Sequence, residues 1–264
     1  MAANKKIPRN RIVSLAPNVT SILLALGAGR DLVGVSKWCK DVADVGRRPQ
    51  VGDCWKIDID EVMPLKPTML IGSVPFAPDT VTKLLAQPVT FVAINPRTLA
   101  DIERDIRVLG RIVNRSAGSE KLIRKMKQAF LAVSKAAHAK RNTRLPRVYC
   151  EAWPKPRISS PPWVAELVEI AGGEMVVASG QRVTDEDVAA AKPEVIVLAW
   201  AAAGSRSKPA SALQNPAWQE VPAIEDRRVF VIRDELLNTP GPPLIKGVWE
   251  LLRIIHDAPA KGLG

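Results

Sequence analysis

The sequence predicts an α/β fold with two lobes, each built around a central sheet, joined by a single long helix. Short apolar runs typical of buried strands alternate with helical patterns through both halves of the chain. Between the halves, one helical pattern covers residues 119–141 without an internal proline or glycine. Such a helix is longer than one small sheet requires, so we interpret it as a rigid link between two lobes.

The first element is a β-α-β step in residues 11–34. A short apolar run typical of a strand ends at Pro17. Asn18 and Thr20 then offer side-chain oxygens that would cap a helix beginning near Ser21. Glycines end this helix, and a second apolar run begins the next strand.

The loop formed by Ala16, Pro17 and Asn18 is the first candidate for a ligand site. Ligands of open α/β sheets gather at the carboxyl ends of strands, and this loop directly follows the first strand. A second loop, residues 51–55, carries Trp55. Its indole is expected either to cover a local core or to offer a stacking surface, and both interpretations stay open.

The alternation of helices and strands continues in both halves, and one unit occurs twice. Asp60, Glu61, Lys66 and Pro67 correspond in order to Asp185, Glu186, Lys192 and Pro193, each set followed by a buried strand. We interpret these segments as equivalent helix-strand units in two lobes. The expected strands are residues 68–72, 89–93, 147–152, 195–199 and 229–232, and the expected helices are residues 57–64, 79–86, 99–113, 163–171, 184–191 and 244–256.

Two loops of the second half differ in character. Residues 153–162 contain Trp153 and several prolines, which fix the backbone of a loop before anything binds. Residues 201–209, which follow Trp200, are small and polar. We expect an amino-terminal lobe at residues 11–115, a linking helix at 116–142 and a carboxy-terminal lobe at 143–264.

Composition and charge argue against a nucleic-acid partner. The chain of 264 residues is 47% hydrophobic and 25% charged, as in an ordinary globular protein. Its net charge of +11 is concentrated at the amino terminus, which includes Lys5 and Lys6, and on a helix face in residues 121–147. Because neither cluster is accompanied by interleaved aromatic residues or a known binding motif, we expect no nucleic acid to bind.

The motifs also argue against catalysis and against a metal held by the protein. The sequence contains no Gly-x-Ser-x-Gly elbow, Walker loop, HExxH motif or dinucleotide fingerprint, so we expect that it is not an enzyme. His138 and His256 are its two histidines, too few for a multi-histidine metal site, and both are expected at the surface. Cys39, Cys54 and Cys150 form no CxxC pair and are expected to be buried or idle thiols.

The sequence as written shows neither a signal peptide nor a membrane-spanning run. No apolar h-region precedes the first strand, and no run of about 18 apolar residues occurs. We therefore expect a cytoplasmic protein as written. We expect a periplasmic one if the native start lies upstream or a leader was removed.

A resemblance to a known family rests on motifs that follow one another from residue 11 to residue 256. They are SLAPNVTSILLALG, VGDCW, DIDEVMPLKPTMLI, a long helix, SSPPWVAELVEIAGG, KPEVIVLAW and PGPPLIKGVWELLRIIH. In this order they resemble the vitamin B12-binding class of ABC-transporter substrate-binding proteins. That class belongs to the helical-backbone group, class III, whose members also bind haem, siderophores and metal ions.

The resemblance implies a ligand held in a cleft between two α/β lobes. It implies a corrinoid, cobalamin-like ligand, an ABC permease dimer as partner, a monomeric protein and no catalytic cofactor. The acidic residues that dock on the transporter would be Asp60 on one lobe and Glu186 on the other. The ligand-binding positions carried over to this sequence are Ala16, Pro17, Asn18, Trp55, Trp153, Trp200, Leu236, Leu237 and Gly241.

The aromatic residues suit such a ligand. A corrin or porphyrin is a wide, largely apolar disc, and indoles offer large, rigid contact areas at a low entropic cost. The chain contains seven tryptophans against one tyrosine and four phenylalanines. Trp249 lies in an apolar helical pattern and is expected in the core, whereas the roles of Trp38, Trp163 and Trp218 stay open.

The alternative ligand is haem, a siderophore or another metal chelate, bound by a protein of the same fold that is intracellular and has no transporter. Leu236 and Leu237 stand where some B12 binders carry aromatic residues, and Pro243 stands where the family often has arginine. These differences weigh against B12 and not against the fold. Since His138 and His256 are not expected to reach the cleft, we expect stacking and hydrogen bonds, and not coordination by the protein, to hold the ligand.

Overall fold

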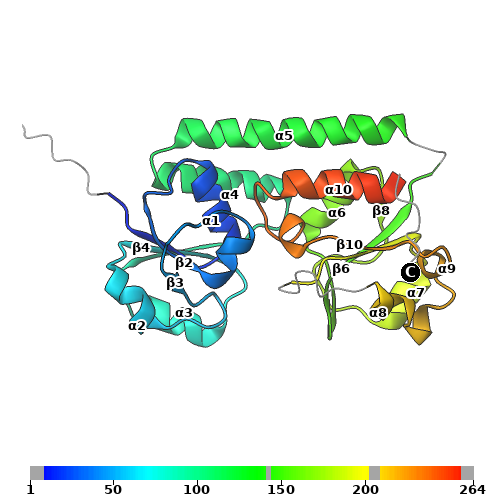
Figure 1. Ribbon diagram of the computed structural model, residues 1–264, viewed down its shortest axis with the longest axis horizontal. Coiled ribbons are helices and arrows are strands. Elements are labelled where there is room, and N and C mark those ends of the chain that lie inside the picture. Colours follow the sequence, from blue (N-terminus) through cyan, green and yellow to red (C-terminus); the bar gives the residue numbers. More distant parts are fainter. Residues whose placement is uncertain (1–8, 141–143, 202–208, 257–264) are drawn as a thin grey trace, which may run out of the picture. The chain divides into compact units, whose positions relative to one another are not determined.

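The computed structural model describes residues 9–140, 144–201 and 209–256 (Figure 1). It contains two compact units, one formed by residues up to 96 together with 103–122, the other by residues 97–102 together with those from 123 onward. Helices α4 (Leu99–Ile112) and α5 (Ser116–Ala139) contribute residues to both units. The long helix is thus confirmed, while the division at residues 11–115, 116–142 and 143–264 stays a prediction. Lys5, Lys6, residue 141 and most of the loop 201–209 lie outside the described residues.

The first unit contains a parallel sheet in the strand order β3-β2-β1-β4-β5. Figure 1 shows α1 on one face of this sheet and α2 and α3 on the other. The chain extends the sheet from β1 first towards β2 and later towards β4, so the strand order reverses at β1 and its carboxyl end is a topological switch point. The elements are β1 (Ile12–Ser14), α1 (Pro17–Ala25), β2 (Leu32–Ser36), β3 (Gln50–Val51), α2 (Ile59–Val62), β4 (Met69–Ser73), α3 (Pro78–Leu85) and β5 (Thr90–Ile94).

Helix α1 begins four residues earlier than predicted. It starts at Pro17, and Ala16 is the N-cap residue without a side-chain cap. The expected start near Ser21 with Asn18 or Thr20 as cap is therefore wrong. Proline suits the first helical position because its φ is already helical and its missing N–H would have no partner there. Asn18 and Thr20 consequently lie inside the first turn, and both are buried.

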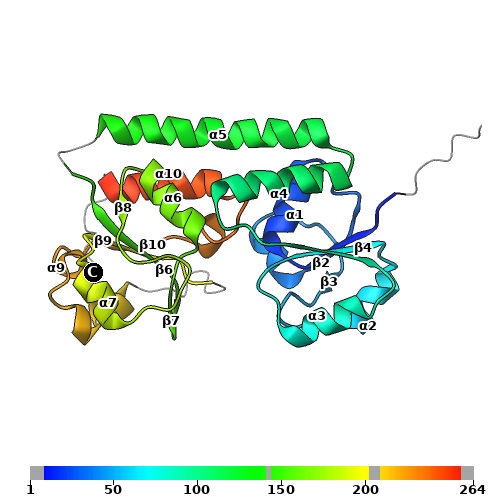
Figure 2. The same cartoon turned by 180° about the vertical axis from the view of Figure 1, so that it is seen from behind.

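The second unit contains a mixed sheet in the order β10-β9-β6-β7, with β8 also paired to β6. Strand β7 is antiparallel to β6, and the other pairs are parallel. Figure 2 shows α6 and α10 on one face of this sheet and α7 on the other. The elements are β6 (Arg147–Pro154), β7 (Arg157–Ser159), α6 (Pro162–Ile170), β8 (Glu174–Met175), α7 (Asp185–Ala191), β9 (Val195–Leu198), α8 (Ala210–Leu213), α9 (Pro222–Glu225), β10 (Val229–Val231) and α10 (Leu244–His256), with 3-10 turns at Lys37–Asp41, Met63–Leu65, Pro216–Trp218 and Asp234–Leu236.

The loop predicted at residues 153–162 is largely a β-hairpin. Strand β6 continues to Pro154, and β7 returns beside it, with Trp153 opposite Ile158. The prolines that indicated a loop lie at the hairpin turn and at the start of α6, where no strand N–H is required. Trp153 is therefore a strand residue and not a loop residue.

The repeated helix-strand unit is confirmed in both halves. Asp58 caps α2 by accepting from the N–H of Asp60 at 2.9 Å, and Thr184 caps α7 by accepting from that of Asp187 at 3.1 Å. In each case a lysine in the left-handed backbone conformation ends the helical segment: φ is 48° at Lys66 and 42° at Lys192. The following strands, β4 and β9, each pair with the first strand of their own sheet.

Trp249 was expected in the core, and this prediction is wrong. Its side chain is 44% exposed. The buried stripe of α10 includes Val248, Leu251 and Ile255, and Trp249 follows Val248 by about 100° around the helix, outside that stripe. Trp163 and Trp218, whose roles were open, are instead buried.

The described cysteines are buried, as expected. Burial raises the pKa of Cys39, and it raises those of Cys54 and Cys150 to about 12. These thiols therefore stay protonated at neutral pH. In the part of the chain that the structure describes, no helix combines the length and the apolar character needed to cross a bilayer.

Candidate functional site

The carboxyl edge of the first sheet brings together the first predicted site loop and the end of β4. Ala16 and Asn18 are buried and Pro17 is half-buried at the start of α1. The side-chain amide of Asn18 donates to Ser73 Oγ at 3.3 Å, which joins the loop after β1 to the last residue of β4. This edge is the one where the strand order reverses, so the predicted loop lies at the switch point.

A buried polar cluster fixes the backbone below this loop. Thr20 Oγ1 lies 2.8 Å from Ser14 Oγ and 3.0 Å from Cys39 Sγ. Cys39 Sγ lies 3.2 Å from Ser36 Oγ at the end of β2. The ends of β1 and β2 and the first turn of α1 are therefore connected by side chains that are themselves buried.

Trp55 presents its indole to solvent on a backbone that is held in place. Its side chain is 64% exposed, so it does not cover a local core, and its use as a stacking surface stays a prediction. Asp53 Oδ1 accepts from the N–H groups of Trp55 and Lys56 at 2.9 and 3.1 Å. Thr80 Oγ1 donates to the carbonyl of Trp55 at 3.3 Å. An exposed indole on a fixed loop is a preorganised contact surface.

Asp53, which was not predicted from the sequence, supports the segment that carries Trp55. Besides the turn at Trp55, its Oδ2 accepts from the indole N–H of Trp38 at 2.8 Å. One carboxylate thus orders two neighbouring tryptophan-bearing segments of the first unit. Aspartate favours such turns because its side chain accepts from the backbone N–H two residues on, so Asp53 within the loop at residues 51–55 is the sequence feature that could have indicated it.

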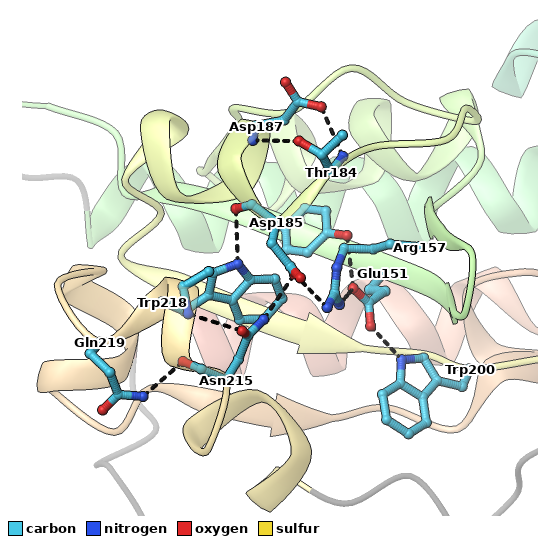
Figure 3. A network of polar contacts seen from close by, with 11 residues as sticks. Glu151, Arg157, Thr184, Asp185, Asp187, Trp200, Asn215, Trp218 and Gln219 are labelled. Atoms are coloured by element: carbon cyan, nitrogen blue, oxygen red, sulfur yellow. Dashed lines mark hydrogen bonds and ion pairs between the residues drawn. The ribbon is translucent and has the colours of Figure 1, made fainter.

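In the second unit, the indole of Trp200 is held by a buried carboxylate (Figure 3). Trp200 follows β9, is half-buried, and donates from Nε1 to Glu151 Oε1 at 2.8 Å. Glu151 lies on β6 with no solvent exposure. Its other oxygen accepts from the hydroxyl of Tyr149 at 2.9 Å and from Arg157 on β7. These donors stabilise a carboxylate that would otherwise be costly to bury.

Arg157 connects this carboxylate to helix α7. Its Nη2 lies 2.7 Å from Asp185 Oδ1, and its guanidinium carbon lies 4.3 Å from the ring centroid of Trp218. The side chain of Asn215 donates to the same Asp185 oxygen at 2.8 Å, and Trp218 Nε1 donates to the Asp185 carbonyl at 3.1 Å. Figure 3 shows these side chains converging between β6, β7 and the first turn of α7.

Burial and neighbouring charges determine the protonation states of Arg157 and Tyr149. Burial alone would lower the pKa of Arg157, but the carboxylates of Glu151 and Asp185 raise it, so the guanidinium stays charged. Burial, together with the charge of Glu151, raises the pKa of Tyr149, so its hydroxyl stays a donor. The sequence analysis missed Glu151 and Arg157, although an acidic residue inside the apolar run VYCEA indicates a buried partner.

The remaining predicted ligand positions differ in accessibility. Trp153 is 42% exposed, and its indole N–H donates to the carbonyl of Lys155 at 2.9 Å across the hairpin turn. Leu236 is half-buried, Gly241 is buried, and the side chain of Leu237 is completely buried. The carbonyl of Leu237 accepts from Trp163 Nε1 at 2.9 Å, which anchors this segment on α6.

Asp60 and Glu186, the predicted docking residues, occupy corresponding positions. Each is the second residue of its helix, α2 or α7, and each follows the N-cap residue by two positions. Both side chains are exposed. Carboxylates in the first turn also suit the positive end of the helix dipole, which is an alternative reason for their presence.

A cavity of about 710 Å³ lies beside β10 in the second unit. Leu213, Phe230, Arg227 and Arg253 are among the residues that line it, and its lining includes none of the predicted ligand positions. No cluster of three or more histidine, cysteine or acidic residues suited to a metal ion occurs among the described residues.

Comparison with known proteins gives a consistent result. A model of the periplasmic binding protein family matches residues 12–236. The uncharacterized ABC transporter substrate-binding lipoprotein YvrC of Bacillus subtilis is 25% identical over 262 residues, covering 96% of this chain and 81% of the relative. The vitamin B12-binding protein of Vibrio cholerae serotype O1 is 26% identical over 262 residues, covering 96% of this chain and 92% of the relative.

Among solved structures, the apo form of the periplasmic heme-binding protein RhuT from Roseiflexus sp. RS-1 has a TM-score of 0.81 at 22% identity, covering 95% of this chain and 99% of that chain. This likeness confirms the α/β fold. The family match and the relatives confirm the resemblance to substrate-binding proteins of the vitamin B12-binding class.

Proposed function

This chain belongs to the periplasmic binding protein family, and we propose that it captures a corrinoid, cobalamin-like ligand for an ABC importer. It is a substrate-binding protein of the ABC-transporter type. The corrinoid is supported by the similarity to the vitamin B12-binding protein of V. cholerae. The observation that carries the proposal is the placement of Trp55 and Trp200 after the carboxyl ends of β3 and β9.

Both indoles suit contact with a large flat ligand. Trp55 is exposed on a fixed loop, and Trp200 is oriented by its bond to Glu151. The backbone of Trp55 and the indole of Trp200 are already fixed before the ligand binds, which lowers the entropic cost. The remaining contacts that we propose follow from the family resemblance and are Ala16, Pro17, Asn18, Trp153, Leu236, Leu237 and Gly241. Because Leu237 is buried, it would act by holding its chain segment in place.

Among the described residues, the histidines, the tyrosine and the cysteines are poorly placed to bind haem iron, which favours a corrinoid over haem. Haem iron is commonly held by histidine, tyrosine or cysteine. Tyr149 is buried and donates to Glu151, and His256 lies 2.9 Å from the carbonyl of Ala171. His138 is in the last turn of α5, outside the loops at the strand ends, and the cysteines are buried. We therefore propose that stacking and hydrogen bonds hold the ligand.

Haem is the second candidate ligand. A porphyrin has the same flat, apolar faces as a corrin, so Trp55 and Trp200 would serve either ligand. Leu236 and Leu237, in place of the aromatic residues of some B12 binders, are the observation that favours it. If haem binds, its visible spectrum should lack the signature of histidine coordination.

The assignment of the two indoles is tested by calorimetric titration with cyanocobalamin. We expect Trp55→Ala and Trp200→Ala each to raise Kd by about tenfold or more, because each removes a large aromatic contact worth about 1.5 kcal/mol or more. Trp249→Ala is the matched control, since Trp249 is also exposed but lies on α10. Equal effects of the three substitutions would contradict the assignment.

The partner and the location follow from the same family. We propose that Asp60 and Glu186 dock the protein on a permease dimer and that the protein acts as a monomer outside the cytoplasmic membrane. The similarity to a lipoprotein and the match to the periplasmic family support this location. Exposed carboxylates at corresponding positions of α2 and α7 suit recognition by cationic side chains of a two-fold symmetric partner.

A further inference from the structure

In the second unit, the buried carboxylate of Glu151 pairs with Arg157, which also pairs with the partly exposed Asp185, and these contacts extend to the proposed ligand contact Trp200. We define the Arg157 cluster as Glu151, Arg157, Asp185 and Trp200, which Figure 3 labels, together with Tyr149, whose hydroxyl donates to Glu151. Glu151 is fully buried, and the side chain of Arg157 is 18% exposed. Buried ion pairs of this kind contribute little net stability compared with apolar residues of similar volume, so their presence calls for another reason.

The geometry of the cluster supplies that reason. The guanidinium of Arg157 uses one terminal nitrogen for Glu151 and the other for Asp185, and the opposite oxygen of Glu151 receives the Trp200 indole. The face of Arg157 lies on Trp218, which fixes the plane of its fork. We propose that Arg157 is a positioning residue: through Glu151 it fixes the Trp200 indole, and through Asp185 it connects that indole to the first turn of α7.

The connection has a consequence for the transporter partner. Glu186, the proposed docking residue on α7, directly follows Asp185. Arg157 therefore links the indole of Trp200 to the helix turn that carries the proposed docking residue. The positioning role itself depends on no ligand, whereas its use in ligand capture rests on the proposed function.

A lysine at position 157 tests the geometry while keeping the charge. Lysine has a single nitrogen and cannot join Glu151 and Asp185 with the two ends of a planar fork. Arg144→Lys is the matched control, because Arg144 also pairs through both terminal nitrogens with one carboxylate, Glu194, but on the surface. Asp185→Asn is a second variant, which keeps an oxygen for Asn215 and removes the charge facing Arg157.

The readout is the indole N–H signal of Trp200 in the proton–nitrogen spectrum of the ligand-free protein, assigned by its loss in Trp200→Phe. We expect slow solvent exchange in the unmodified protein. In Arg157→Lys the signal should shift and exchange about tenfold faster, as expected when a charge-assisted hydrogen bond loses its support. Asp185→Asn should shift it less, and Arg144→Lys should leave it unchanged.

Unchanged Trp200 signals in both Arg157→Lys and Asp185→Asn would overturn the proposal. If Arg157→Lys does not fold, Asp185→Asn decides alone: a shifted signal supports the positioning role, and an unshifted one refutes it. Titration with cyanocobalamin and haem separates this role from the proposed function. Failure of the unmodified protein to bind either ligand would refute the function and leave the result for Arg157 intact.

Discussion

At the scale of the residue, the placement of a few carboxylates decides how the tryptophans are used. Asp53 orders Trp38 and the turn at Trp55, and Glu151 orders Trp200. Each carboxylate accepts from N–H groups of more than one segment, so the indole it holds depends on the local fold. The indole of Trp200 is therefore oriented before any ligand arrives, and at Trp55 the backbone is fixed.

A third carboxylate, Glu194, gives a prediction about pH. Hydrogen bonds from Arg144 lower the pKa of Glu194, and the backbone N–H of Arg147 donates to it at 2.9 Å. A folded-state pKa below the unfolded one contributes stability above the ordinary glutamate pKa, and this contribution disappears as the pH falls through the lowered value. We therefore expect Glu194→Gln to lower the free energy of unfolding at neutral pH by about 0.5–1 kcal/mol, a value reduced by solvent screening.

The measurement is urea unfolding of Glu194→Gln and of the unmodified protein from pH 7 down to pH 3. The difference between the two should decrease as the pH falls, because Glu194 becomes protonated and its charge no longer distinguishes it from glutamine. Arg144→Gln should show the same dependence, since it removes the partner. A difference that persists unchanged at pH 3 would show that Glu194 acts by packing and not by its charge.

At the scale of the element, glycine decides how closely helix α10 approaches the segment of Leu236 and Leu237. A Cβ atom on Gly247 would lie 2.0 Å from the carbonyl oxygen of Leu236. Backbone atoms would have to move to accept it. This close approach keeps Leu237 buried and holds the segment that follows β10.

Two helical glycines provide a matched test of this packing. Gly247→Ala should lower the free energy of unfolding by about 2–3 kcal/mol, the usual cost of forcing atoms into a filled site. Gly118→Ala on α5, whose Cβ would meet nothing closer than 3.7 Å, should raise it by about 0.5–1 kcal/mol through helix propensity. Thermal and urea unfolding measure both. A neutral Gly247→Ala would contradict the proposed contact.

The sequence predicted elements well where a pattern was long or repeated. The apolar periodicity of α5 and α10 and the paired units around Lys66 and Lys192 all appear in the structure. Errors occurred where tertiary context overrides local preference. Pro17 is equally compatible with the end of a strand and with the start of a helix. The prolines near Trp153 indicated a loop, although this segment of β6 pairs with β7 in a hairpin.

The candidate site was predictable only in part. Loops after strands led to Ala16, Pro17, Asn18, Trp55 and Trp200, since topology places them after the carboxyl ends of strands, and their role in ligand binding stays a prediction. Glu151 and Arg157 could not be paired in advance, because their interaction depends on the antiparallel return of β7. Trp249 was wrongly predicted to be buried, because an apolar residue beside the buried stripe of a helix gives the same sequence pattern as one within it.

At the scale of the whole molecule, the corresponding carboxylates on the two units predict how a transporter recognises the protein. We expect Asp60→Lys combined with Glu186→Lys to abolish or strongly reduce binding to the permease, because two attractive contacts become repulsive. Affinity for the ligand should stay unchanged. Asp79→Lys, an exposed first-turn substitution on α3, is the matched control.

This prediction is measured by co-purification with the permease in detergent and by titration with cyanocobalamin. Normal binding of the doubly substituted protein to the permease would exclude Asp60 and Glu186 as docking residues. Failure of the unmodified protein to bind the permease would instead support a binding protein of the same fold that acts without a transporter.

The most direct test of the account is a calorimetric titration of the unmodified protein with cyanocobalamin, with haem as the parallel ligand. We expect saturable binding of one cobalamin per chain and weaker or absent binding of haem, since among the described residues the cysteines and Tyr149 are buried and both histidines lie on helices outside the site loops. Saturation by haem with no heat from cobalamin would contradict the corrinoid assignment. It would mean that Leu236, Leu237 and Pro243 mark a porphyrin-binding member of the family.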